Sequence, residues 1–141
     1  MSNEQTTLAF DYGKVRIGVA VGHQPGELTR RLSVVRNSPA GPDWAAITKL
    51  VDEWLPDQLV VGLSRHADGS DSPVTKAIRR FAHALGEQFS RPVHLEDERL
   101  SSVAAREVLV EEGLSHAKIQ KQLDSEAARQ ILLSWSRQAR R

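Results

Sequence analysis

The sequence predicts an α/β domain built on a five-stranded mixed sheet, with helices packed on its faces. Three observations predict this class. The first quarter of the chain carries three consecutive strand-like stretches with no helical pattern between them, which indicates an antiparallel meander. Helical and strand-like patterns then alternate, which is typical of βαβ units. A length of 141 residues suits one domain, residues 1–141, with a substantial core.

The first two strands are expected to form a hairpin. Residues 6–11 are typical of a short buried strand, and residues 15–22 alternate in polarity with a period of two. Gly18 and Ala20 fall on one face of the second strand, and small residues there indicate the close approach of a helix or of backbone. A third strand is expected over residues 28–36.

The remainder alternates between the two kinds of element. Strands are predicted over residues 58–63 and 92–95, and helices over residues 42–55, 72–89, 101–112 and from near Leu123 to the tail. Pro42 lies near the start of the first helix, where proline is favoured. Ser101 or Ser102 is a candidate N-cap of the third helix, and Gly113 follows its end. The predicted order is therefore β-β-β-α-β-α-β-α-α.

Composition excludes several functional classes. The chain has no cysteine, so disulfides, thiolate nucleophiles and cysteine-based metal sites are excluded. No stretch approaches the roughly 18 consecutive apolar residues of a membrane span, and the N-terminus lacks the pattern of a signal peptide. We therefore expect a cytoplasmic protein with no membrane partner. The net charge of +1 is balanced, so nucleic-acid binding depends on local clusters of Lys and Arg.

Three carboxylates lie at the ends of predicted elements. Asp11 closes the first strand, Glu98 follows the strand at residues 92–95, and Asp124 falls in the first turn of the last helix. If the fold brings them together, the like charges raise one another's pKa unless a divalent cation neutralises them. Mg²⁺ and Mn²⁺ prefer such oxygen ligands, and two ions roughly 4 Å apart can activate water for phosphodiester cleavage.

Each carboxylate also has a structural interpretation that spacing leaves open. Asp11 can stabilise the following turn through an Asx hydrogen bond. Asp124 can act as the N-cap of the last helix. Glu98 can form a weak surface ion pair with Arg99.

The loop at residues 64–73 is a second candidate site. It contains Asp68-Gly69 and leads into a helix, whose backbone N–H groups can bind a phosphate. Arg65 and His66 add positive charge when His66 is protonated. Taken alone, the loop is better interpreted as a surface turn in which Ser72 caps the helix.

Four segments together resemble the YqgF family, also called RuvX-like, whose members are described as pre-16S rRNA nucleases and Holliday junction resolvase homologues. They are Asp11-Tyr12-Gly13 with the run from Arg16 to Val21, Val60-Val61-Gly62-Leu63 with Asp68-Gly69-Ser70, the run from Asp97 to Ser102, and Asp124 with Ala127 and Ala128. The resemblance extends from Leu8 to about Trp135. This family is similar to the RNase H-like nucleases, which implies a five-stranded mixed sheet flanked by helices.

The resemblance also implies a site and an activity. Asp11, Glu98 and Asp124 are expected to be the catalytic residues and the ligands of Mg²⁺ or Mn²⁺. Arg16, Arg65, Arg99 and Lys118 are the expected contacts to the nucleic acid. The implied function is a metal-dependent nuclease that acts on structured nucleic acid, most directly at the 5′ end of pre-16S rRNA, as a monomer or homodimer. Ser64 and His66 depart from the family's usual Pro and Asn.

Three other functions compete with this interpretation. A dimer of the same nuclease can resolve four-way DNA junctions, and the same fold can serve as a non-catalytic RNA-binding module. Asp11-Tyr12-Gly13 before a second strand also resembles the phosphate motif of actin-like kinases. Those enzymes need two lobes, and 141 residues are too few for both.

Overall fold

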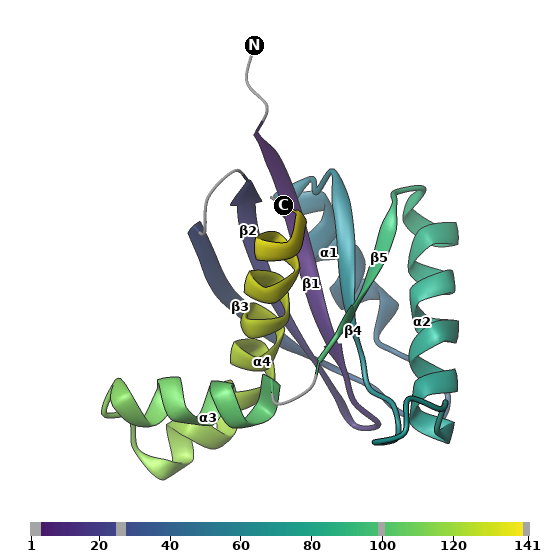
Figure 1. Cartoon of the computed structure of the whole chain (residues 1–141). Helices are drawn as coiled ribbons and strands as arrows, with labels where there is room; N and C mark the ends of the chain where they lie inside the picture. The colour runs from purple at the N-terminus through teal and green to yellow at the C-terminus, as the bar shows by residue number, and fades with distance from the viewer. Residues whose placement is uncertain (1–3, 25–27, 99–100, 140–141) are drawn as a thin grey trace.

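The computed structural model describes residues 4–24, 28–98 and 101–139, apart from the side chain of residue 139. The strands are β1 (Gln5–Tyr12), β2 (Arg16–Gln24), β3 (Leu28–Arg36), β4 (Gln58–Leu63) and β5 (Val93–Asp97). The helices are α1 (Trp44–Trp54), α2 (Pro73–Phe89), α3 (Ser101–Glu111) and α4 (His116–Ala139). The predicted order of elements is confirmed (Figure 1).

The sheet is mixed, as the sequence predicts. Its spatial order is β3-β2-β1-β4-β5, with β1 and β3 both antiparallel to β2. Strand β4 runs parallel to β1 and to β5, so β1 and β4 end at the same edge of the sheet as the start of β2. Asp11 therefore lies opposite Gly18 in the β1–β2 ladder.

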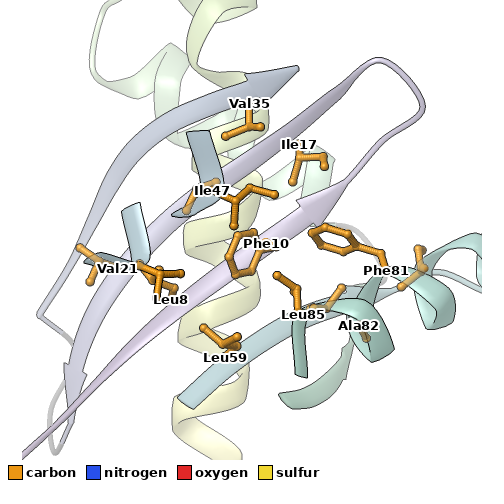
Figure 2. Packing of buried hydrophobic residues seen from close by; sticks show 14 of the residues in the cluster. Leu8, Phe10, Ile17, Val21, Val35, Ile47, Leu59, Phe81, Ala82 and Leu85 are labelled. Carbon is orange, nitrogen blue, oxygen red and sulfur yellow. The ribbon is translucent and has the colours of Figure 1, made fainter. Parts of the chain in front are cut away.

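The two faces of the sheet carry different helices. Leu8 and Phe10 of β1 belong to the large core beneath α1 and α2, together with Ile47 and Phe81 from those helices (Figure 2). Ala9 points the other way and packs with Ile131 and Leu132 of α4, because neighbouring residues of a strand face opposite sides. Helix α4 contacts all five strands, and α3 packs against α4 (Figure 1).

The last helix begins earlier than predicted. Helix α4 starts at His116, not near Leu123, because Ser115 supplies a cap: the Lys118 N–H donates to Ser115 Oγ at 3.3 Å. The residues that follow are mostly good helix formers. Asp124 therefore lies in the third turn of α4, and its predicted placement in the first turn or at the N-cap is wrong. Among the described residues, no helix combines the length and the apolar character needed to cross a bilayer.

The other caps mostly agree with the sequence. Ser72 caps α2 through a reciprocal capping box with Thr75. Gly113 has φ +76° just after α3, in the left-handed region that ends many helices. Helix α1 is capped by Asp43, whose carboxylate accepts from Ala46 N–H at 3.1 Å. Ser101 is the first helical residue of α3, so neither Ser101 nor Ser102 is the N-cap.

Candidate functional site

Asp11 projects from the end of β1 on the α4 face of the sheet. It shares that face with Ala9, two residues earlier, while Tyr12 packs on the opposite face beside Phe81. The side chain is half-buried and lies next to the open edge where β1 ends. A buried strand thus holds this carboxylate at a fixed point between the sheet and α4.

Glu98 reaches the same face just after the end of β5, the outer strand next to β4. Its backbone N–H donates to Leu63 O at 3.1 Å, which extends the β4–β5 pairing by one residue. Glu96, two residues earlier, faces α4 and accepts from the Ser134 hydroxyl at 2.7 Å. Glu98 therefore lies on the α4 side. Its carboxyl group donates a hydrogen bond to the carboxylate of Asp11.

Two glycines make room for the acidic side chains. An ideal Cβ on Gly62 would lie 2.9 Å from Glu98 Oε2, so the absent side chain leaves space for this carboxyl group. An ideal Cβ on Gly18 would lie 1.9 Å from the backbone oxygen of Asp124, a distance that no real side chain can occupy. The predicted close approach at Gly18 is confirmed, and the partner is α4 at Asp124. The importance of Gly62 was not predicted.

Asp124 is the third carboxylate near this position, but its side chain forms an ion pair with Arg16. Its Oδ2 accepts from Arg16 Nε at 2.9 Å, and the Arg16 side chain is 62% exposed. The negative charge of Asp124 also acts on Asp11, since it raises the pKa of that carboxyl group. The structure thus brings Asp11 and Glu98 into contact and places Asp124 within electrostatic reach of Asp11.

The pKa values of the contacting pair are displaced upward. Burial is the largest cause for both groups. It raises the pKa of Asp11, and together with the negative charge of Asp11 it raises the pKa of Glu98 from 4.5 to about 9. Without a cation the pair therefore carries one shared proton at neutral pH, because two ionised carboxylates in contact repel each other in a partly desolvated site.

This shared proton predicts a pH-dependent stability of the cation-free protein. Glu98 binds its proton more tightly in the folded state than in the unfolded chain, so its contribution to stability is complete below the unfolded pKa. That contribution is lost as the pH rises from about 5 to 9. We expect the melting temperature, measured in chelator, to fall across this range.

The Glu98→Gln variant is the control for this prediction, because a glutamine keeps the shape of the side chain and cannot titrate. Its melting temperature should depend less on pH than that of the unaltered protein over the same interval. Equal slopes for the two proteins would show that Glu98 titrates as an ordinary surface carboxylate.

The three carboxylates are chemically suited to bind a hard divalent cation, but their observed positions suit such a site only in part. Asp11, Glu98 and Asp124 offer carboxylate oxygens, the ligands that Mg²⁺ and Mn²⁺ prefer. Within the described ranges, no group of three or more such side chains is close enough to form a ready metal cluster. Asp124 is the member held away, through its ion pair with Arg16. A cation here requires Glu98 to release its proton and Arg16 to release Asp124.

Three of the four predicted nucleic-acid contacts lie among the described residues. Arg16 begins β2 and is the ion-pair partner of Asp124. Arg65 is exposed in the loop between β4 and α2, and its charge helps to lower the pKa of Asp71 after the larger effect of Arg79. Lys118 is exposed in the first turn of α4. Arg99 lies outside the described residues.

A buried ionic network beside Asp124 was not predicted. Glu126 is fully buried and accepts from Arg31 Nη1 and Arg129 Nε, both at 2.8 Å. Burial alone would raise the pKa of Glu126, but hydrogen bonds from Arg129 and Arg31 outweigh burial and lower it. Glu126 thus fastens α4 to β3 two residues from Asp124. In the sequence it is one charge among many on a helix, and no local signal marks it as buried.

Comparison with known proteins identifies relatives along nearly the whole chain. Residues 5–138 match the family model described as "RuvX: Holliday junction resolvase". A protein of Nitrosomonas europaea is 44% identical over 92% of this chain and 88% of its own length. One of Cronobacter sakazakii is 42% identical over 94% of this chain and 96% of its own. Both carry the name "Putative pre-16S rRNA nuclease".

Solved structures share the fold at low sequence identity. RuvC of Thermus thermophilus in complex with a Holliday junction substrate has a TM-score of 0.63 at 19% identity, over 96% of this chain and 95% of its own. Fowlpox virus resolvase in complex with Holliday junction DNA has a TM-score of 0.59 at 12% identity, over 96% of this chain and 99% of its own. The chain therefore has a RuvC-like, RNase H-like fold, and this part of the prediction is confirmed.

Proposed function

The chain belongs to the RuvX family, and from that premise we propose that it is a metal-dependent nuclease that processes the 5′ end of pre-16S rRNA. The names of relatives at 44% and 42% identity support an RNA substrate. Relatives from bacteria, together with this substrate, favour action in the bacterial cytoplasm.

The contact between the carboxyl groups of Asp11 and Glu98 is the observation that carries this proposal. Two carboxyl groups buried in contact would bind a divalent cation in place of their shared proton when such a cation is available. We assign Asp11, Glu98 and Asp124 as the residues that would hold Mg²⁺ or Mn²⁺ and as the catalytic residues. Two bound ions would supply an activated water and stabilisation of the departing oxygen.

The surrounding cations have a separate task. Arg16, Arg65, Arg99 and Lys118 are proposed to hold the phosphate backbone so that one phosphodiester lies against the carboxylates. Arg16 is exposed enough to leave Asp124 and contact a phosphate instead. Binding through such contacts weakens as the salt concentration rises, because each phosphate that is neutralised releases condensed counterions.

Resolution of four-way DNA junctions is the second candidate, and the description of the matched family favours it. Cutting a junction symmetrically needs two active sites, which means a dimer. A dimer in solution that cuts junctions and leaves the RNA intact would favour this activity. A monomer that trims RNA would exclude it.

One experiment separates these functions. Purified protein is incubated with pre-16S RNA carrying its 5′ extension, and separately with a four-way DNA junction, each with Mg²⁺, Mn²⁺ or chelator. We expect the RNA to be cut at its 5′ side in Mg²⁺ or Mn²⁺ and to stay intact in chelator. If neither substrate is cut with either metal, the nuclease proposal is wrong, and binding of the intact RNA would then indicate a non-catalytic RNA-binding module.

Cation binding also has a readout that does not depend on cleavage. At pH 8, Mg²⁺ at ten times its dissociation constant should stabilise the protein by about 1.4 kcal/mol and raise its melting temperature by several degrees. The Asp11→Asn variant should show little of this rise, since it lacks the central carboxylate. An equal rise in both proteins would place the bound cation elsewhere on the molecule.

A further inference from the structure

A groove opens beside the acidic site, formed by Asp11, Glu98 and Asp124, on the side of β3. It has a volume of about 1220 Å³ and runs between the start of β2, the end of β3, the segment at residues 37–43 and α4. Arg16 lines it and also holds Asp124, so the groove begins where the acidic site ends. Its volume exceeds the roughly 300–1,000 Å³ of typical small-molecule pockets, which favours an extended ligand.

Three cations from different elements line this groove. Arg16 and Arg36 are direct partners in the β2–β3 ladder, so their side chains leave the same face of the sheet. Lys121 adds a third positive charge from α4, three residues before Asp124. Like charges directly opposite each other in a sheet destabilise it, and an anion between them would remove that penalty.

The positive charge is largely uncompensated. In the ranges that the structure describes, Arg36 and Lys121 have neither an ion pair nor a side-chain hydrogen bond. Asp43 is the carboxylate among the lining residues, and its Oδ1 is engaged in capping α1. The groove therefore presents a positive surface that continues away from the carboxylates.

Neither an aromatic ring nor the amide of Asn37 is available among the described residues of the groove to contact a base. None of the lining residues is aromatic, so the groove lacks the ring on which a base would stack. Asn37 Nδ2 donates to Gly13 O at 2.7 Å, and Asn37 Oδ1 accepts from Ser38 N–H at 3.0 Å, so its amide is already satisfied. Recognition by exposed Arg and Lys is recognition of phosphates, which carry no sequence information.

We propose that this groove binds the sugar–phosphate backbone of the nucleic-acid strand that leads into the acidic site. The inference rests on the proposed function and deepens it. Arg36 and Lys121 grip phosphates that flank the reacting one, without regard to base sequence. Arg16 links the two regions, since it reaches Asp124 on one side and lines the groove on the other.

The test compares two double variants by fluorescence anisotropy in chelator, so that the strand is bound without being cut. The probes are labelled oligo-U and oligo-A RNA of roughly 16 nucleotides, the upper site size of single-strand binding folds. Arg36→Ala/Lys121→Ala removes two groove cations. Lys49→Ala/Arg80→Ala removes two exposed positive charges from α1 and α2, the helices that pack on the opposite face of the sheet. A DNA strand and an RNA duplex serve as further arms.

We expect the groove variant to bind both RNA probes at least tenfold more weakly at low salt. Its plot of log affinity against log salt should be shallower by about 0.7 for each lost phosphate contact on a single strand. The control variant should bind within twofold of the unaltered protein. Melting temperatures check the fold, and Arg36→Gln/Lys121→Gln replaces the alanine pair if the latter unfolds.

Each outcome bears on a different claim. The groove assignment is overturned if its variant keeps normal affinity and salt dependence, or if the control variant loses as much. A preference of more than tenfold for one RNA sequence would overturn backbone recognition. If the groove variant loses binding and the unaltered protein cuts neither RNA nor junction, the groove stands and the nuclease proposal fails. If the protein cuts RNA and the groove variant binds normally, the groove alone fails.

Discussion

Asp11→Asn is expected to abolish cleavage while the protein stays folded. An amide cannot hold a divalent cation as a carboxylate does, and Asp11 is the carboxylate that contacts Glu98 and senses the charge of Asp124. We expect cleavage to fall by about a thousandfold or more, which corresponds to roughly 4 kcal/mol of lost transition-state stabilisation. The melting temperature should stay the same or rise, because the substitution removes a partly buried like charge.

Two carboxylates serve as matched controls for Asp11→Asn. Asp52 is exposed on α1, and Asp52→Asn should leave cleavage unchanged. Asp97 precedes Glu98 in the chain, but alternation along β5 directs it to the opposite face of the sheet. Asp97→Asn should therefore retain activity within a few-fold. Full activity in Asp11→Asn, measured on pre-16S RNA with Mg²⁺, would remove the proposed mechanism.

Gly18→Ala is expected to have the largest effect on the fold. The added Cβ would lie 1.9 Å from the Asp124 carbonyl oxygen and 2.8 Å from Ser125 N, and these are backbone atoms that cannot rotate away. Helix α4 must then move off the sheet. Overpacking of this kind costs at the upper end of the usual range, about 3 kcal/mol or more, which lowers the melting temperature by roughly 10 °C. Cleavage should be lost with the position of Asp124.

Gly22→Ala separates this effect from a general intolerance of larger side chains. Gly22 lies on the same face of β2, and a Cβ there would meet Leu132 Cδ2 at 2.7 Å, the end of a side chain that can turn. Its cost should be clearly smaller, and its cleavage should stay close to normal. If Gly18→Ala melts and cleaves like the unaltered protein, then α4 does not depend on this close contact.

The order of elements could be predicted because each leaves a local pattern. The period of two in β2, the apolar stripe of α2 and the glycine after α3 depend on residues that are near one another in sequence. Helix α4 starts seven residues before the predicted position at Leu123, because Ser115 caps it and the residues that follow favour a helix without a marked apolar stripe. Local pattern alone therefore places elements better than it places their ends.

The site could not be derived from spacing, and the reason is geometric. Asp11 and Glu98 meet because β4 separates β1 from β5 and Gly62 leaves room on the α4 face. No local pattern specifies that strand order, and only the family resemblance pointed to the convergence. Arg36 shows a similar limit. The sequence predicts that β2 and β3 pair, but it does not predict which residues lie opposite each other, and only the observed register makes Arg36 the partner of Arg16.

Helix α4 covers the sheet and carries Asp124, and it follows all five strands in the chain. During synthesis the ribosome therefore releases β1 and β5, with two of the acidic side chains, before the segment that completes the set. Until that segment emerges and docks, the face of the sheet with Ala9 and Val60 lies uncovered. A polypeptide that lacks α4 would thus leave this apolar face exposed to water and would also lack Asp124.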